Sequence, residues 1–380
     1  MGKPKIRFKG YTEDWEQRKL GECVEFLDTQ RKPLEGAKRV SGSYPYYGAS
    51  GIVDYVDGYL FDEELVLLSE DGANITDRNY PVCFLAAGKY WVNNHAHVLK
   101  ILPENENNFI CNSLERKDYT QYNTGMAMPK LNKEVCKSIP VECPSYEEQK
   151  KIGDYFRNLD HLITLHQRKC EETKKLKKYM LQKMFPQNGQ TVPEIRFAGF
   201  TEDWEQRKLG ELGEIMTGST PSTSNSEYYS EDGIPWVTPT DINSQTISDT
   251  PRKLSEEGMK VGRVVPANTI LCTCIASIGK NTLLTVKGSF NQQINCLTPN
   301  EYNDAYFLLT ESVFWSNIMK RMAAAGTMQI VNKTEFSELT TMVPKLEEQK
   351  KIGQYFRALD HLITLHQCKC YDLEILMRIC

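Results

Sequence analysis

The sequence has no apolar run long enough to cross a membrane and no excess of positive charge. A spanning helix needs about 18 apolar residues in a row, and no stretch of the 380 residues approaches that length. No apolar segment follows Met1, so we expect no signal peptide, no membrane contact and a cytoplasmic protein. The net charge is −4, whereas a protein devoted to DNA binding is usually basic. A DNA-binding role therefore has to rest on local patches, such as the lysine-rich segment 168–183.

The sequence also lacks the patterns of common metal and nucleotide sites. Gly279-Lys280-Asn281 resembles the end of a phosphate-binding loop, but Lys280 is not followed by Ser or Thr. His95 and His97 share a strand face, yet no further ligands stand nearby at zinc spacing, which leaves strand structure or DNA contact for them. The twelve cysteines are scattered and are typical of free thiols in a reducing compartment. We expect no metal, no cofactor and no catalytic residue.

What the sequence has is a repeat of two separate segments. Residues 12–22 read TEDWEQRKLGE, and residues 201–211 repeat them at an offset of 189. Residues 147–170 recur as 347–370 at an offset of 200, with three differences in 24 positions. The sequence between the repeated segments is unlike in the two halves. One architecture used twice, with a different insert each time, is the simplest explanation.

The second repeated segment has the apolar period of a long helix. Steps of three and four residues are typical of a helix with one buried stripe or a coiled-coil seam. In each half the stripe consists of four residues, which are Ile152, Phe156, Leu159 and Ile163 and then Ile352, Phe356, Leu359 and Ile363. Glu147 to Phe185 would form a rod of roughly 58 Å at 1.5 Å per residue. The second helix follows the first to Cys370 and then departs completely.

The two inserts are mixed in character and rich in short strands. Runs of β-branched and aromatic residues, such as 65–68, 82–85, 97–102, 269–275 and 293–297, are separated by Gly, Asn and Pro turns. We predict five segments: a domain at 1–146, a helix at 147–185, a linker at 186–193, a second domain at 194–346 and a shortened helix at 347–380. The expected fold class is α+β.

Two long helices with matching stripes would bury them most easily against each other. An antiparallel pair would relate the halves by a pseudo-twofold axis, and duplex DNA has twofold axes of its own. Such a protein could read two half-sites at a distance fixed by the rod. Because the inserts differ, the expected site is bipartite and asymmetric, with an unread spacer.

Several stretches carry a resemblance to a known family. They are Arg-Phe-x-Gly followed by Thr-Glu-Asp-Trp in both halves, residues 45–52 and 70–73 in the first insert, residues 218–221 and 234–242 in the second, and the Glu-Glu-Gln-Lys-Lys-Ile helix starts. With these, the chain resembles the specificity (S) subunit of a type I restriction–modification system over essentially its whole length. The resemblance implies two target-recognition domains on an antiparallel coiled coil. It also implies double-stranded DNA, two modification (methyltransferase) subunits and restriction (translocase–nuclease) subunits as partners. The Asn/Asp-Pro-Pro-aromatic tetrapeptide of the methylating chemistry is absent, so the chain itself is expected to be non-catalytic.

Candidate DNA contacts are polar loop residues, because amide, hydroxyl and basic groups match the edges of bases and the phosphates. In the first half they are Tyr46, Tyr47, Asn94, His95, Lys130, Asn132 and Lys133. In the second half they are Ser219, Thr220, Thr238, Asn291, Gln292, Gln293, Asn332 and Lys333. The Asn-Lys pair before each helix suits a phosphate clamp or a helix cap equally, and the two tyrosines suit an aromatic core as well as DNA. The functional alternative to a specificity subunit is a coiled-coil scaffold with two protein-binding domains.

Overall fold

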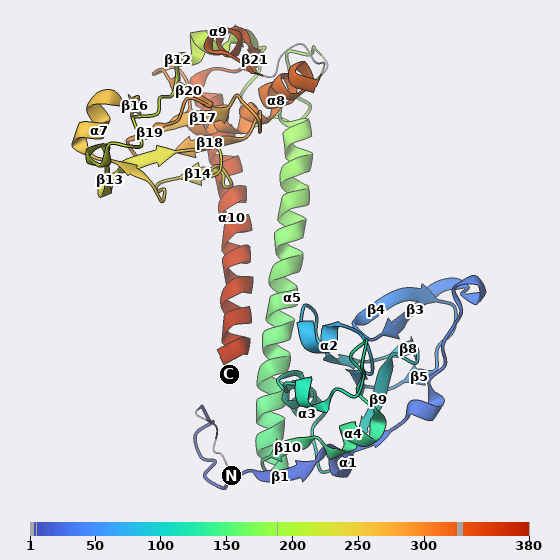
Figure 1. Cartoon of the computed structure of the whole chain (residues 1–380). Coiled ribbons are helices and arrows are strands. Elements are labelled where there is room, and N and C mark those ends of the chain that lie inside the picture. Colours follow the sequence, from blue (N-terminus) through green and yellow to red (C-terminus); the bar gives the residue numbers. More distant parts are fainter. Residues whose placement is uncertain (1–3, 5, 188, 325–329, 380) are drawn as a thin grey trace. The chain divides into compact units, whose positions relative to one another are not determined.

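Each repeated helical segment forms one continuous helix in the computed structural model, which describes residues 4, 6–187, 189–324 and 330–379. These helices are α5 (Tyr146–Lys183) and α10 (Leu346–Ile379) (Figure 1). The prediction of two long helices is confirmed, although α5 ends two residues before Phe185. Pro186 explains this end, because the residue before a proline is disfavoured in helical conformation. No helix among the described residues is long and apolar enough to span a membrane.

The chain divides into two compact units, and the division passes through both long helices. The first unit comprises Met1–Leu165 with Cys370–Cys380, and the second comprises His166–Lys369. Each unit therefore contains one strand-rich region with part of α5 and part of α10. The domain boundaries predicted from the sequence, at 146, 185, 193 and 346, remain predictions.

The helices pair antiparallel within the second unit. His166 Nδ1 lies 2.9 Å from His366 Nδ1, and Lys177 Nζ lies 2.5 Å from Asp360 Oδ1. Residue numbers thus rise along α5 as they fall along α10. In the first unit the Cys370 thiol donates to the Ile163 carbonyl at 3.7 Å. The apolar stripe predicted from the sequence faces this contact or the adjoining core: Phe156, Leu159, Ile352, Phe356 and Leu359 are buried, and Ile152, Ile163 and Ile363 are partly buried.

The start of each repeat pairs in the same way with the strand that precedes its long helix. Strand β1 (Glu16–Lys19) pairs antiparallel with β10 (Pro140–Cys143), and β11 (Glu205–Lys208) pairs in the same way with β21 (Thr340–Val343). The short helices α1 (Leu20–Cys23) and α6 (Leu209–Leu212) follow. Identical sequence has given identical local structure in both units.

The insert of the first unit forms two four-stranded sheets. One is antiparallel in the order β2-β9-β6-β7, with bounds Val24–Phe26, Ala96–Ile101, Leu65–Ser69 and Cys83–Ala86. The other has the order β4-β3-β8-β5, with bounds Gly51–Val56, Ser41–Gly48, Lys89–Val92 and Phe61–Asp62, and its β3–β8 pair is parallel. Helices α2 (Asn74–Asp77), α3 (Asn107–Glu115) and α4 (Lys133–Ser138) complete the unit.

The insert of the second unit also forms two sheets. The larger has the order β12-β20-β17-β18-β14, with bounds Gly213–Thr217, Ile294–Pro299, Thr269–Thr273, Asn281–Leu284 and Thr246–Ile247. The smaller has the order β15-β13-β19-β16, with bounds Lys253–Leu254, Tyr229–Val237, Gly288–Phe290 and Val264–Val265. Helices α7 (Glu256–Val261), α8 (Ala305–Ala324) and α9 (Lys333–Glu338) surround them. All five strand-like runs predicted from the sequence contain a strand.

A glycine in each long helix allows α3 or α8 to approach it closely. A Cβ atom at Gly153 would collide with the Glu106 carboxylate, and one at Gly353 would collide with that of Asp304. These two carboxylates accept from the Phe109 and Phe307 amides at the start of α3 and α8. In each unit, therefore, a glycine at the equivalent position of the long helix leaves room for the start of α3 or α8 to pack against it.

The cysteines of the described residues are free thiols, as the sequence predicts. Eleven cysteines in the described part of the chain are unpaired, and most are buried. Burial raises the pKa of the Cys296 thiol to about 12. Such thiols pack as small apolar groups.

Candidate nucleic-acid interface

Six candidate residues of the second unit gather where two parallel strands end. Strands β13 and β19 are parallel, with Val237 opposite Phe290. Thr238 and Asn291 follow these residues directly, and the Asn291 amide donates to the Val237 carbonyl at 3.0 Å. Carboxyl ends of parallel strands meet at one edge of a sheet, which is where α/β proteins commonly bind ligands. The cluster could not be predicted from the sequence, because its residues come from three segments that are far apart in the chain. They are Ser219, Thr220, Thr238, Asn291, Gln292 and Gln293.

Asn291 organises the turn rather than facing solvent. It is 8% exposed. Its Oδ1 accepts from the Gln293 amide at 3.0 Å, and its Nδ2 donates to Gln293 Oε1 at 3.1 Å. Gln292 is exposed, and the Thr220 hydroxyl donates to its amide oxygen. The turn therefore presents the side chains of Gln292 and Thr220 outward.

Thr238 and Ser219 are held by neighbouring groups. The Thr238 hydroxyl donates to Asp241 Oδ2 at 2.7 Å and lies 2.8 Å from the Thr240 hydroxyl. Ser219 Oγ accepts from the Arg263 amide at 2.8 Å. The contacts of Thr238 with Thr240 and Asp241 were not predicted from the sequence, because Thr-Asp after a strand is only a weak indication of a turn.

The first unit builds the same turn from different residues. Strands β3 and β8 are parallel, and the Asn93 amide donates to the Tyr47 carbonyl at 3.0 Å. Asn93 Oδ1 accepts from the His95 amide at 2.8 Å, as Asn291 Oδ1 accepts from Gln293. Asn94 and His95 are exposed in the positions that Gln292 and Gln293 hold in the second unit. His95 Nδ1 lies 2.8 Å from Asp71 Oδ1, a partner that the sequence did not reveal.

The two candidate tyrosines belong to the packing beneath this edge. Tyr46 is 1% exposed, its hydroxyl accepts from the Leu34 amide at 3.0 Å, and the Arg39 guanidinium lies over its ring. Tyr47 is half-buried and stacks on Phe84, and burial raises the pKa of its hydroxyl. Of the two roles that suited these residues, the structure supports the aromatic core.

The two Asn-Lys pairs differ between the units. Asn332 is the N-cap residue before α9, and its side chain accepts from the Glu335 amide at 3.0 Å while the Glu335 carboxylate accepts from the Asn332 amide. Asn132 holds the N-cap position before α4 but makes no side-chain cap hydrogen bond. Lys133 lies over the Phe26 ring, whereas Lys333 is exposed. Residues 325–329, which precede the second pair, lie outside the described residues.

A buried cluster of charges, which the sequence did not predict, lies beside the turn of the first unit. His97 is 1% exposed; its Nδ1 lies 2.8 Å from Asp28 Oδ2, and its Nε2 lies 2.7 Å from the Leu131 carbonyl. Burial opposes the charged imidazole, but the hydrogen bonds to Asp28 and Cys136 outweigh it and raise the pKa of His97 to about 10. His97 is therefore an imidazolium at neutral pH, with both nitrogens donating.

The cluster extends to the loop residue Lys130. Glu70 forms an ion pair with Arg31 at 2.5 Å and lies 3.3 Å from the ammonium of Lys130, a side chain that is about half exposed. Arg31 also donates to the Ala96 carbonyl at 2.6 Å. These charged contacts connect β9, the segment before β3 and the loop that contains Lys130, and they support the turn at 93–95.

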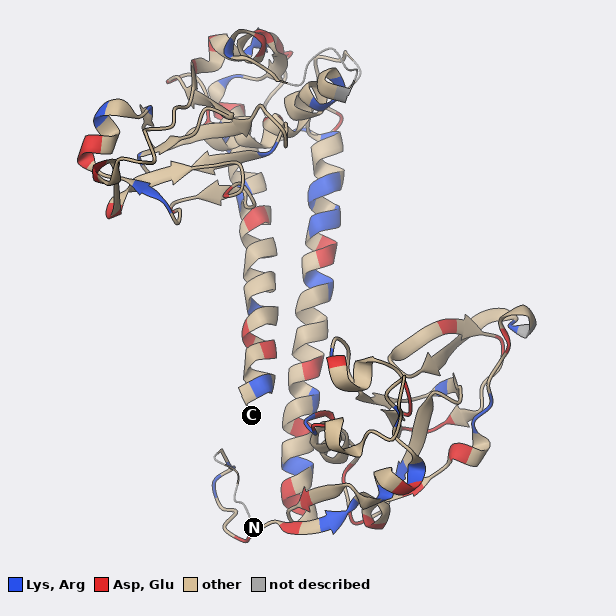
Figure 2. Ribbon diagram, in the orientation of Figure 1, with Lys and Arg blue, Asp and Glu red and all other residues tan. Residues whose placement is uncertain are grey.

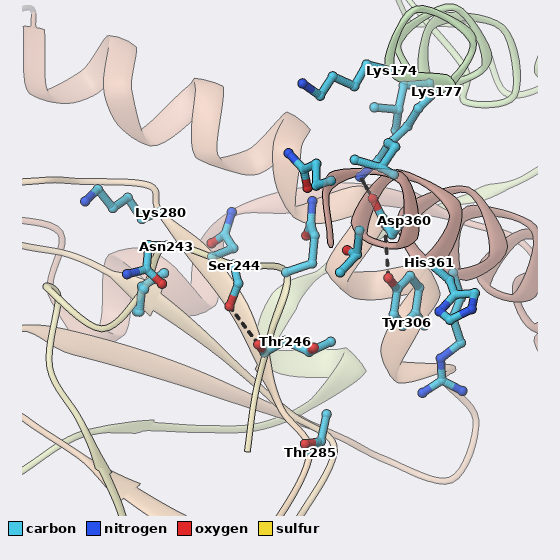
Figure 3. A pocket seen from close by; sticks show the side chains of 18 of the residues that line it. Lys174, Lys177, Asn243, Ser244, Thr246, Lys280, Thr285, Tyr306, Asp360 and His361 are labelled. Atoms are coloured by element: carbon cyan, nitrogen blue, oxygen red, sulfur yellow. Dashed lines mark hydrogen bonds and ion pairs between the residues drawn. The ribbon is translucent and has the colours of Figure 1, made fainter. Parts of the chain in front are cut away.

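A basic cleft of about 1180 Å³ lies between the helix pair and the sheet of the second unit (Figure 3). Its walls carry Lys174, Lys177, Lys178, Lys280 and Arg357, against Asp360 as the acid. The polar loop 243–246 forms the opposite wall. Asp360 is already engaged, since it accepts from Lys177 and from the Tyr306 hydroxyl at 3.0 Å. The net charge of the lining is positive, and several of the blue Lys and Arg bands of Figure 2 lie along α5.

No group of three or more His, Cys, Asp or Glu side chains is placed to hold a metal ion within the described ranges. His166 and His366 face each other alone, and the pKa of His166 is lowered by burial and by His366, Lys169 and Lys369. The two turns present hydrogen-bond donors and acceptors, and the cleft presents lysine and arginine cations. That chemistry suits recognition of a nucleic acid.

Comparison with known proteins gives one family. The type I restriction modification DNA specificity domain matches residues 12–175 and 201–374. A protein of Haemophilus influenzae named "Putative type I restriction enzyme specificity subunit S.HindORF215P" is 27% identical over 92% of this chain and 89% of its own length. The MjaVIII specificity subunit of Methanocaldococcus jannaschii is 21% identical over 95% and 90%.

Solved structures share the fold. The S subunit of a type I restriction–modification system from M. genitalium superposes with a TM-score of 0.74 at 14% identity, covering 99% of this chain and 97% of its own. A structure that concerns assembly of a type I system has a TM-score of 0.51 at 17% identity, covering 97% and 96%. At these identities the likeness concerns the fold.

Proposed function

The chain belongs to the type I restriction modification DNA specificity family and is a specificity subunit of such a system, and we propose that its two units read the two halves of one split DNA site. The observation that carries this proposal is the pair of equivalent turns at 93–95 and 291–293. They share backbone hydrogen bonds and differ in every exposed side chain. One frame with two sets of readers fits an asymmetric site with an unread spacer.

Within each turn we assign base contact to the exposed side chains. In the first unit these are Asn94 and His95, and in the second they are Thr220 and Gln292, with the partly exposed Gln293 beside them. Amide groups can pair with the edge of adenine, and hydroxyls can pair with several bases. Asn291 and Thr238 position the turn instead.

Phosphate contact is assigned to the exposed cations beside the turns. These are Lys130 in the first unit and Lys280 and Lys333 in the second, with Asn132 as a neutral donor. The lysines of α5 that line the cleft would add contacts to the backbone. Contacts to phosphates hold a protein in register but carry no base information.

We assign no catalytic step to the chain. Methyl transfer and cleavage belong, in this proposal, to two modification subunits and to restriction subunits that assemble on the long helices. The chain supplies geometry and recognition, and it needs no cofactor for either.

The test maps methylated adenines in a host that carries this chain with its modification partner. A single motif with two defined halves and an unread spacer is expected. Exchanging residues 213–299 for those of a relative with another motif should change one half only. A continuous motif, or a change in both halves, contradicts the proposal. No methylation and no DNA footprint with or without the partner would favour a protein-binding scaffold instead.

A further inference from the structure

The third residue of each equivalent turn has one polar side-chain atom bound by a neighbour. In the first unit this residue is His95, which is bound by Asp71, and in the second it is Gln293, which is bound by Asn291. A histidine ring and a side-chain amide each have two polar atoms. The contact made by one atom therefore decides which hydrogen-bonding group the other atom presents.

In the second unit a backbone hydrogen bond fixes the orientation of the Gln293 amide. The backbone N–H of Gln293 donates to Asn291 Oδ1 at 3.0 Å, and only an oxygen can accept there. The other atom of the Asn291 amide is then Nδ2, a donor, which lies 3.1 Å from Gln293 Oε1. Gln293 thus holds its oxygen against Asn291, which is 8% exposed. Its Nε2 keeps both hydrogens and makes no hydrogen bond to any residue within the described ranges.

In the first unit Asp71 fixes the tautomer of His95. Nδ1 of the ring lies 2.8 Å from Asp71 Oδ1 and 2.9 Å from Oδ2. A carboxylate only accepts, so Nδ1 carries the hydrogen, and Nε2 of the neutral ring is an acceptor. The His95 side chain is 50% exposed. Its Nε2 makes no hydrogen bond in the part of the chain that the structure describes.

These two unpaired atoms match different bases. In the major groove guanine and thymine present only acceptors, cytosine presents only a donor, and adenine presents one of each. A donor such as the Gln293 amide nitrogen therefore matches guanine or thymine and is opposed by cytosine. An acceptor such as His95 Nε2 matches cytosine or adenine and is opposed by guanine and thymine.

We propose that His95 reads cytosine or adenine in the half-site of the first unit, and that Gln293 reads guanine or thymine in the half-site of the second. Asp71 and Asn291 are positioning residues that set these choices without touching DNA. The inference rests on the proposed function and adds to it the class of base that is read at one position of each half-site. The two turns share a backbone and present opposite hydrogen-bonding groups.

The test uses the full chain in complex with its modification partner at pH 8, where an ordinary imidazole is neutral. The split site is mapped first, and bound duplexes are then selected from pools in which each defined position is randomised in turn. The selection compares bases within one variant, so a loss of affinity that is common to all duplexes does not enter.

Gln293→Glu keeps an acceptor for Asn291 and replaces the unpaired donor by an acceptor. One position of one half-site should change from guanine or thymine to cytosine or adenine, with a preference of roughly tenfold. Gln293→Ala should leave that position unread. Gln206→Glu makes the same chemical change at an exposed position of β11 and should leave the whole motif unchanged.

In the first unit His95→Lys presents only donors and should change one position of the other half-site from cytosine or adenine to guanine or thymine, again roughly tenfold. His95→Gln can donate its amide to Asp71 and present its oxygen, so it should keep the original preference. Asp71→Ala releases the ring and should let both classes of base be accepted, whereas Asp71→Asn retains an accepting oxygen and should restore the preference. A merely structural role of Asp71 would weaken binding without changing the base.

The outcomes separate this inference from the function on which it rests. If the site is split but Gln293→Glu and Gln293→Ala select the same bases, or His95→Lys and His95→Gln do so, this inference is wrong and the proposed function stands. A continuous motif, or no motif, overturns the proposed function and this inference with it. A variant that fails to fold loses both half-sites at once, and the variants of the other unit then decide.

Discussion

Lys177 donates to Asp360 across the helix pair of the second unit, with 2.5 Å between Nζ and Oδ1. Both side chains are largely buried, and Asp360 also accepts from the Tyr306 hydroxyl. The equivalent aspartate of the first unit is Asp160, and the position equivalent to Lys177 is Met377. Burial raises the pKa of the Asp160 carboxyl. The departure of the sequence after Cys370 has thus removed a charge partner from one unit only.

Met377→Lys should restore that ion pair. The lysine would stand opposite Asp160 as Lys177 stands opposite Asp360, and it should lower the pKa of Asp160 towards its ordinary value. We expect a gain of about 0.5–1 kcal/mol in the free energy of unfolding of the first unit. Urea unfolding at pH 7 measures the gain, and Asp160→Asn in the same background is the control. An equal gain with and without the Asp160 carboxylate would show that the lysine acts in another way.

His97→Gln should destabilise the first unit by about 3 kcal/mol at pH 7, because it leaves the Asp28 carboxylate without its buried cation. Hydrogen exchange of the β9 amides measures the loss, and His95→Gln, at an exposed position, should change it little. The pH dependence follows from a folded pKa of about 10 against an ordinary 6.5. Below pH 6.5 the stabilisation is complete, because the imidazole is charged in both states. It falls as the pH rises towards 10, and a flat profile between pH 7 and 10 contradicts this account.

The elements of the fold were largely predictable from the sequence, because helices and strands follow local periods. The long helices follow from steps of three and four residues, and the strands follow from β-branched runs between turns. The interface was predictable only in part. Gln292 and Asn94 stood out as amides, but nothing local shows that Thr238 and Asn291, 53 residues apart in the chain, meet at the ends of two parallel strands.

Pairs distant in sequence were not predictable at all. His97 and Asp28 are separated by 69 residues, and the raised pKa of His97 comes from Asp28 and Cys136 and not from its neighbours in the chain. The burial of Tyr46 likewise depends on Leu34 and Arg39 folding over it. A polar or aromatic residue in a loop-like segment has the same sequence signal whether it faces solvent or the core.

Glu311→Gln should stabilise the second unit above pH 7. Glu311 is 4% exposed, and burial raises the pKa of its carboxyl to about 8 despite the hydrogen bonds from Thr341 and the Met342 amide. Between the ordinary pKa of 4.5 and about 8 the folded state holds a proton that the unfolded state has released, so stability falls as the pH rises through this window. Glutamine keeps the shape and removes the proton. We expect a gain of up to about 4 kcal/mol at pH 8.5.

Urea unfolding between pH 5 and 9 gives the free energy of unfolding of each protein as a function of pH. The gain appears as a difference between the slopes of these two pH profiles. Glu301→Gln, at an exposed position, serves as the control and should leave the slope unchanged. If the free energy of unfolding has the same pH dependence in the wild type and in Glu311→Gln, a group other than Glu311 is the one that titrates.

Gln292→Ala should relax recognition of one half of the DNA site and leave the other half unchanged. The side chain is exposed at the turn after β19 and is held by the Thr220 hydroxyl, so its loss removes a directed amide without disturbing the core. A base contact of this kind contributes about 1–3 kcal/mol of discrimination, which corresponds to roughly 5- to 150-fold. Methylation mapping should show the wrong base accepted at a position of the half-site read by the second unit. Asn94→Ala is the matched variant, because the first unit holds it in the same turn, and it should relax the opposite half. If both variants relax the same half, the two turns do not read separate half-sites.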